Sequence, residues 1–136
     1  MLDELRDRIS AFIAQHQICV ISTSGATGAW VAPAWHFGYG LEIVCLLPSW
    51  SDALYYLEQD PHVMVIILDT QSKALRWLQY TGNAQIVHWL DVEQILPQGL
   101  KNMQVDDRYI AVRITAKRID LIDENCGWGA RETLDL

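Results

Sequence analysis

The chain has 136 residues, of which 51% are hydrophobic, so we expect one domain spanning residues 1–136 around one buried core. Its 10 lysines and arginines are outnumbered by 17 aspartates and glutamates, which gives a formal charge of −7. Because nucleic acids and anionic membranes are bound through clustered cations, this charge argues against both as partners.

The cysteines Cys19, Cys45 and Cys126 form neither a CxxC pair nor a Cys/His set with the spacing of a zinc site. We therefore expect reduced thiols, no bound metal and a cytoplasmic location. Charged residues crowd the first eight positions and interrupt any apolar stretch long enough for a signal peptide or a membrane span.

The first 16 residues predict an amphipathic helix, because apolar side chains recur three or four positions apart between Leu2 and Ile13. Four runs rich in β-branched and aromatic residues then predict strands: Ile18–Thr23, Trp30–Phe37, Leu41–Leu47 and Val63–Leu68. The connectors after the first and second runs are short and contain glycine, which is typical of antiparallel hairpins.

A short helix is expected to cross between the third and fourth of these strands. Ser51 or Asp52 can cap its start, and Pro61 ends it. The longer run Leu75–Leu90 alternates through Gly82, which favours a strand with a bulge or a sharp bend at the glycine.

The C-terminal third predicts a helical turn at Asp91–Leu96, two strands at Tyr109–Thr115 and Lys117–Asp123, and a loosely ordered tail at 124–136. No strand alternates with a long helix, which argues against a parallel sheet. The predicted fold is mainly β with peripheral helices, an antiparallel barrel of six to eight strands.

Four segments resemble a known family: Ala32–Trp35 (APAW), Leu57–Val63 (LEQDPHV), Trp77–Ala84 (WLQYTGNA) and Arg113–Ile119 (RITAKRI). With the order of the expected elements over roughly residues 2–123, they are similar to the pyridoxamine 5'-phosphate oxidase-like FMN-binding split barrels. The resemblance implies a split β-barrel, a homodimer, and FMN held in clefts between the two barrels.

The resemblance also implies a set of cofactor-binding residues: Trp35, His36, Leu47, Ser49, Trp50, Ser51, Arg76, Trp77 and Gln79. In the family, the FMN phosphate lies at the start of the crossing helix, where a serine is followed by basic residues. This chain has Asp52 and Ala53 there, and a carboxylate repels a phosphate. Ser49, Ser51 and the helix amides would remain to hold it, with Lys73 or Arg76 from the next connection.

Several of these residues also have plain structural explanations. Tryptophans commonly fill cores and dimer interfaces, so Trp50 and Trp77 either stack on the flavin ring or occupy its place. His36 either hydrogen-bonds the cofactor or is a buried histidine with satisfied nitrogens.

Two features near the C-terminus complete the candidates. A group of carboxylates is expected to face water because its members fall in connectors and at a strand end: Asp106, Asp107, Asp120, Asp123 and Glu124. In some split barrels the tail of one chain reaches the partner's cleft. By that analogy, Trp128 would lie near the cleft and Arg131 would supply a cation.

Two functions follow from the resemblance. One is an FMN-dependent oxidoreductase acting on a small molecule, in which the flavin carries the redox chemistry and no residue is needed as an acid or base. The other is a split-barrel homodimer that has lost FMN and binds another ligand, or has a stress or regulatory role without catalysis. The chain has no Gly-x-Ser-x-Gly motif of the kind found in hydrolases, and no motif that names a substrate or electron donor.

Overall fold

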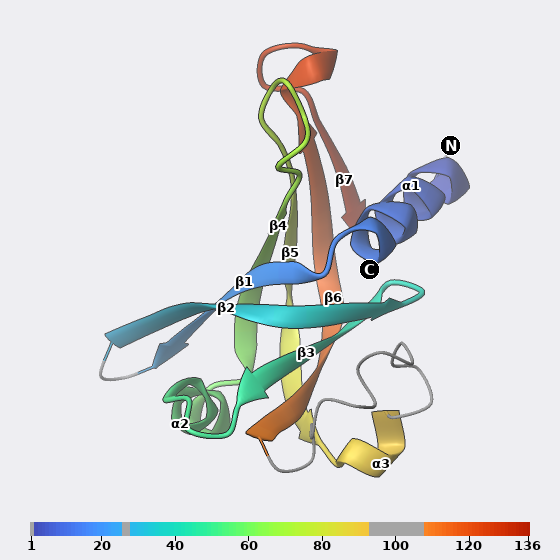
Figure 1. Cartoon of the computed structure of the whole chain (residues 1–136). Helices are drawn as coiled ribbons and strands as arrows, with labels where there is room; N and C mark the ends of the chain where they lie inside the picture. Colours follow the sequence, from blue (N-terminus) through green and yellow to red (C-terminus); the bar gives the residue numbers. More distant parts are fainter. Residues whose placement is uncertain (1, 26–27, 93–107) are drawn as a thin grey trace.

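The computed structural model describes residues 2–25, 28–92 and 108–136. Six antiparallel strands form a closed barrel (Figure 1): β1 (Ile18–Gly25), β2 (Gly28–Tyr39), β3 (Glu42–Pro48), β4 (His62–Leu68), β5 (Arg76–Val87) and β6 (Tyr109–Asp123). Their order is β3-β2-β1-β4-β5-β6, and the pairing of β3 with β6 closes the ring. The predicted antiparallel barrel of six to eight strands is therefore confirmed.

The barrel interior is filled by alternate residues of each strand and covered by two helices. Helix α1 (Leu2–Gln15) buries Leu5, Ile9, Phe12 and Ile13 in this core, as its amphipathic pattern predicts. Helix α2 (Ala53–Gln59) is the predicted crossing helix and buries Ala53 and Leu57.

A second, smaller core lies on the outside of the barrel, over β2, β3 and β6. It comprises Phe37, Val44, Leu46, Val92 and Ala111. Val92 belongs to helix α3 (Trp89–Val92), which overlaps the helical turn predicted for Asp91–Leu96. Residues 93–96 of that prediction lie outside the described residues.

The predicted bulge at Gly82 is confirmed. The register of β5 against β6 shifts between Thr81 and Gly82, because Thr81 pairs with Arg118 and Gly82 pairs with Ala116. Lys117 is thus the extra residue of β6. A Cβ at Gly82 would overlap the backbone of Thr115, so the close approach of β5 and β6 requires glycine.

Two expectations about the C-terminal region were wrong. Tyr109–Thr115 and Lys117–Asp123 are one continuous strand, β6, because the bulge absorbs the irregularity at Lys117 without breaking the pairing. The tail is also ordered: a 3-10 turn at Glu124–Cys126 leads into strand β7 (Arg131–Asp135), which pairs with β6. Pairing with β6 and burial of Leu134 in the barrel core order residues 131–135, and neither contact is evident from the local sequence pattern.

Within the part of the chain that the structure describes, no helix is long and apolar enough to cross a membrane. In the same residues, no group of three or more histidine, cysteine or acidic side chains is arranged to hold a metal ion.

Candidate functional site

The outer face of β1, β2 and β4 is apolar, although the barrel core lies on the other face. The alternate residues Cys19 and Ile21 of β1 point into the core, which leaves Ile18 and Val20 outside with 56% and 40% of their surface exposed. Leu68 of β4 is 45% exposed and Val31 of β2 is 63% exposed. Antiparallel sheets that face water usually carry polar side chains there, so this face is suited to a ligand or a partner.

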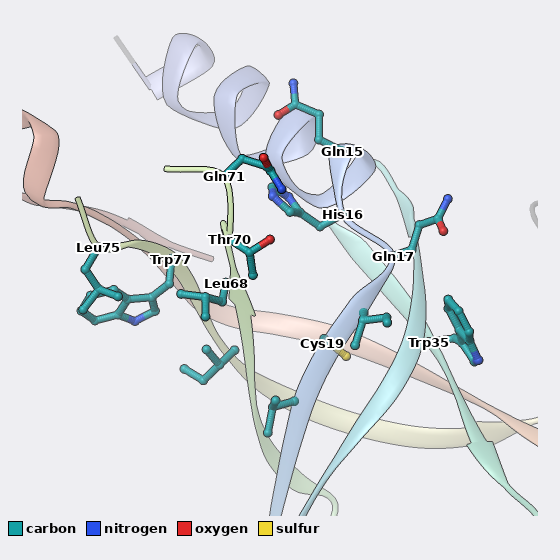
Figure 2. Close-up of a pocket in the computed structure, with 13 residues that line it drawn as sticks. Gln15, His16, Gln17, Cys19, Trp35, Leu68, Thr70, Gln71, Leu75 and Trp77 are labelled. Carbon is teal, nitrogen blue, oxygen red and sulfur yellow. The ribbon is translucent and has the colours of Figure 1, made fainter. Parts of the chain in front are cut away.

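A groove of about 860 Å³ runs across this face. Its floor is formed by outward side chains of β1 and β4: Ile18, Val20, Ile66 and Leu68. Trp35 and Trp77 lie on opposite sides of it (Figure 2). Pockets that bind small organic molecules commonly have volumes of about 300–1,000 Å³ and mainly apolar walls, so the groove fits a ligand of that kind.

The polar rim of the groove comes from two segments that the fold brings together. The end of α1 supplies Gln15 and His16, and the turn after β4 supplies Thr70 and Gln71. That turn is held by Asp69, whose carboxylate accepts hydrogen bonds from the Gln71 amide at 3.0 Å and from the Arg76 guanidinium at 3.0 Å. The Gln71 amide and Arg76 hold the pKa of Asp69 below its ordinary value.

His16 is fixed in the rim by both ring nitrogens. Its Nδ1 lies 2.7 Å from the Phe12 carbonyl oxygen, to which it donates, and its Nε2 lies 3.7 Å from a carboxylate oxygen of Asp69. The Nδ1 hydrogen bond fixes the orientation of the imidazole ring at the edge of the groove.

A smaller groove of about 230 Å³ continues from the first. It shares Ile18 and Trp35 with the larger groove and is otherwise lined by Pro33, Leu46, Pro48 and Tyr109, among others. Pro48 ends β3, so this groove leads toward Ser49 and the start of α2, the position at which the resemblance places a phosphate.

The start of α2 is largely closed to a phosphate by its own hydrogen bonds. The Ser49 amide donates to the Arg108 carbonyl at 2.7 Å and the Ser51 amide to the Pro48 carbonyl at 2.9 Å. The Ser51 hydroxyl is buried and accepts from the Ala53 amide at 3.2 Å.

The rest of the first turn follows the same pattern. The amides of Leu54 and Tyr55 donate to carbonyls at the helix start, at 3.4 and 3.1 Å. Asp52 is exposed and adds negative charge at this end of the helix.

The structure brings two of the nine predicted site residues into the large groove, Trp35 and Trp77. Gln79 pairs with Ile66 on the same outer face but does not line the groove. Ser49 and Trp50 are exposed in the turn before α2, and Trp50 is 83% exposed.

The remaining four predicted residues point elsewhere. Leu47 is in the barrel core, and the Ser51 hydroxyl accepts a hydrogen bond from the Ala53 amide just before α2, whose N-cap residue is Asp52. His36 is buried and its Nε2 donates to the Ile13 carbonyl at 3.2 Å, but its Nδ1 has no hydrogen-bond partner among the described residues, so only one of its two nitrogens is satisfied. The guanidinium carbon of Arg76 lies 4.6 Å from the centre of the Phe12 ring of α1, and the guanidinium donates hydrogen bonds to Asp69 and Asp123.

The groove floor was missed by the sequence analysis. The signal was present in Ile18–Ile21, where apolar residues occupy both the inward and the outward positions of one strand. A strand buried on one side only would alternate apolar with polar residues, so this run indicates a strand covered on both faces.

Below the groove, two thiols and one imidazole meet inside the barrel. The Cys19 and Cys45 sulfur atoms are 3.8 Å apart and both are buried. His36 lies beside them, and its Nδ1 has no hydrogen-bond partner among the described residues. The hydrogen bond from Cys45, with help from His36, lowers the pKa of the Cys19 thiol, although burial opposes the shift.

Asp120 is not the surface carboxylate that its sequence position predicts. Its side chain is 1% exposed and accepts hydrogen bonds from Arg131 at 2.9 Å, from Arg118 at 3.1 Å and from Thr133. Pairing of β7 with β6 creates this cluster, so Arg131 is occupied within its own chain. Asp106 and Asp107 lie outside the described residues.

No family model matches the chain, and no curated protein matches it in sequence. A protein from Clostridium acetobutylicum, described as related to general stress protein 26 of B. subtilis and of the pyridoxinephosphate oxidase family, superposes with a TM-score of 0.79 at 15% identity. That match covers 98% of this chain and 96% of that one.

Two further solved structures show the range of proteins with this architecture. The general stress protein 26 from Bacillus anthracis has a TM-score of 0.76 at 20% identity and covers 98% of this chain and 99% of its own. A heme binding protein from Mycobacterium smegmatis has a TM-score of 0.72 at 13% identity, covering 96% of this chain and 56% of that one.

Both of the first two superpositions cover nearly the whole of each chain, so they include the barrel and its helices in this chain. At identities of 13–20%, these likenesses concern the fold. The chain therefore has the split-barrel fold of the pyridoxamine 5'-phosphate oxidase-like proteins.

Proposed function

We propose that the chain is a homodimeric split barrel that holds a flavin ring in the groove between Trp35 and Trp77 and acts as a flavin-dependent oxidoreductase on a small molecule. The observation that carries the proposal is the groove itself: about 860 Å³, apolar, and flanked by two tryptophans on an otherwise uncovered face. Flat side chains beside an apolar slot suit a flat aromatic ligand.

The two halves of FMN fit this chain differently. The ring suits the groove, whose floor and sides are apolar and aromatic. The cations expected for the phosphate are not in place. Asp52 and Ala53 replace two of them, and Arg76 is bonded to Asp69 and Asp123. Lys73 is exposed in the turn after β4 and lines neither groove. We therefore propose a flavin as the cofactor and assign no phosphate anchor.

The chain's own contribution would be positional. Trp35, Trp77 and Leu75 would exclude water from the faces of the ring, and the amide side chains of Gln15 and Gln71 offer hydrogen bonds to its polar edge. A bound flavin would supply the electron transfer. None of these side chains is required as an acid or base.

A second copy of the chain is the proposed cover for the apolar face. Ile18, Val20, Val31 and Leu68 are between 40% and 63% exposed and lie on neighbouring strands. Stable dimers bury roughly 800 Å² on each partner, with apolar residues at the centre of the interface. A partner seated here would also close the groove.

A flavin titration tests the cofactor. Riboflavin and FMN are each added to the purified protein, and binding is measured by quenching of flavin and tryptophan fluorescence. Trp77→Ala should weaken binding about fivefold, since a stacked aromatic contributes about 1 kcal/mol beyond area burial. Tyr55→Ala is the control, because Tyr55 is exposed on α2 and does not line the groove.

If neither flavin binds at micromolar concentration, the flavin proposal fails. The chain would then fit the other function that the resemblance allows, a split barrel without flavin. Hemin is titrated in parallel, because one protein of this fold is described as binding heme. A tight hemin complex without flavin binding would contradict the proposal in favour of that cofactor.

Light scattering after size-exclusion chromatography tests the dimer. Val31→Glu places a charge on the apolar face and should convert the dimer to a monomer. Leu2→Glu is the matched control, because Leu2 is 64% exposed on α1 and Val31 is 63% exposed. A monomeric wild-type protein, or a Val31→Glu variant that remains dimeric, would count against this interface.

A further inference from the structure

We infer that the ligand of the groove is an uncharged planar molecule, a flavin without its phosphate, and that the site does not recognise FMN through the phosphate. This inference rests on the proposed function and names the ligand class that the same groove selects. It is carried by the charges and hydrogen bonds of the residues around the groove.

The first argument is the composition of the lining. Among the described residues, those that line the two connected grooves include no lysine and no arginine. Their polar members are amides, a hydroxyl, a phenol and His16, whose nitrogens face Phe12 and Asp69. A phosphate needs charge-assisted donors to offset the loss of its hydration, and this lining does not supply them.

The second argument is that nearby arginines are already paired. Arg76 bonds both Asp69 and Asp123, and its guanidinium lies against the Phe12 ring under α1. Arg131 and Arg118 share the buried carboxylate of Asp120. Moving Arg76 toward a ligand would break its ion pairs with both Asp69 and Asp123, and moving Arg118 or Arg131 would take one of two cations from the buried Asp120.

The third argument concerns the start of α2, where the small groove leads. The amides of Ser49, Ser51 and Ala53 are used within the chain, and the Ser51 hydroxyl is buried. The exposed carboxylate of Asp52 repels an anion at the same place. The flavin ring therefore fits the apolar face, and a phosphate on the flavin does not increase its affinity.

Riboflavin and FMN provide the test, because they carry the same ring and differ by the phosphate. Dissociation constants are measured for both with the wild-type protein at 20 and 300 mM NaCl. We expect riboflavin to bind at least as tightly as FMN, and its affinity to be unchanged by salt, because no ion pair forms. Trp77→Ala should weaken the binding of both flavins by the same factor, about fivefold.

The outcomes separate the inference from the proposed function. FMN binding tighter than riboflavin, with an advantage that shrinks at 300 mM NaCl, would overturn the inference while leaving the flavin function intact. Loss of FMN binding alone in Trp77→Ala would also overturn it. If neither flavin binds, the proposed function itself is overturned. Riboflavin equal to or tighter than FMN supports both.

Discussion

The Asp120 cluster makes a prediction about stability that is independent of any ligand. Asp120→Asn keeps the shape of the side chain and removes its charge. In the wild-type protein this carboxylate accepts hydrogen bonds from Arg131 and Arg118 while 1% exposed. The variant loses the charge-assisted part of those bonds, which tie β7 to β6, so the free energy of unfolding should fall.

The magnitude follows from the pKa of Asp120. Burial alone would raise it, but hydrogen bonds from Arg131, Thr133 and Arg118 outweigh burial and lower it from 3.8 to about 2. A carboxyl whose pKa is lower in the folded than in the unfolded chain stabilises the fold above the unfolded pKa. Its contribution is about 2 kcal/mol near pH 7 and is lost as the pH falls from about 5 to 2.

Urea unfolding of both proteins at pH 7, 5 and 2, at one fixed protein concentration, measures this contribution. Wild type should exceed Asp120→Asn by about 2 kcal/mol at pH 7, and the gap should fall below about 0.5 kcal/mol at pH 2. Two results would refute the reasoning: equal stability at pH 7, or a gap that does not change with pH. The second would mean that Asn fails for reasons of packing and not of charge.

Three further predictions concern the barrel. Tyr80→Phe removes a buried hydroxyl that lies within hydrogen-bond distance of two backbone carbonyls, so the free energy of unfolding measured in urea should fall by about 1–3 kcal/mol. The control Tyr55→Phe, at an exposed position, should leave it unchanged. Gly82→Ala should lower the free energy of unfolding by about 1–3 kcal/mol, because the added methyl group overlaps the backbone of Thr115. Unchanged stability in urea or thermal unfolding would contradict the close packing at the bulge. A thiol reagent such as Ellman's should react rapidly with one cysteine per native chain, the exposed Cys126, and with all three after unfolding; fast reaction of more than one would show that the Cys19 and Cys45 pair opens readily.

The split-barrel architecture does not by itself select a cofactor. One similar structure is described as belonging to the pyridoxinephosphate oxidase family and another as a heme binding protein, and both superpose on nearly the whole of this chain. The choice of ligand therefore has to be argued from the side chains of each protein and not from the fold. In this chain the described side chains that line the groove are mainly tryptophans, aliphatic residues and amides, which favour a ligand by its shape and its lack of charge.

Most of the barrel could be predicted from the sequence because the information is local. Runs rich in β-branched and aromatic residues predicted β1 to β4, with glycine-bearing connectors after the first two, and the glycine at position 82 predicted the bulge. The helix over the first residues followed from its three- and four-residue spacing. These patterns record which residues each segment buries, and burial in a small barrel allows few arrangements.

The candidate site was less predictable because it depends on which face of each strand points outward and on which distant segments meet. His36 and Trp35 are neighbours in the chain, yet one is sealed in the core under Ile13 and the other flanks the groove. A shift of one residue in pairing would exchange them, and the sequence alone does not set that register.

The sequence by itself therefore determined the class of fold, the crossing helix and the bulge. Only the tertiary structure decided that the tail becomes β7, that Asp120 is buried, and that Arg76 and Arg131 are bound by carboxylates of their own chain. The physical reason is that a strand at a free edge, or an ion pair between residues far apart in sequence, gains its energy from a partner that no local pattern records.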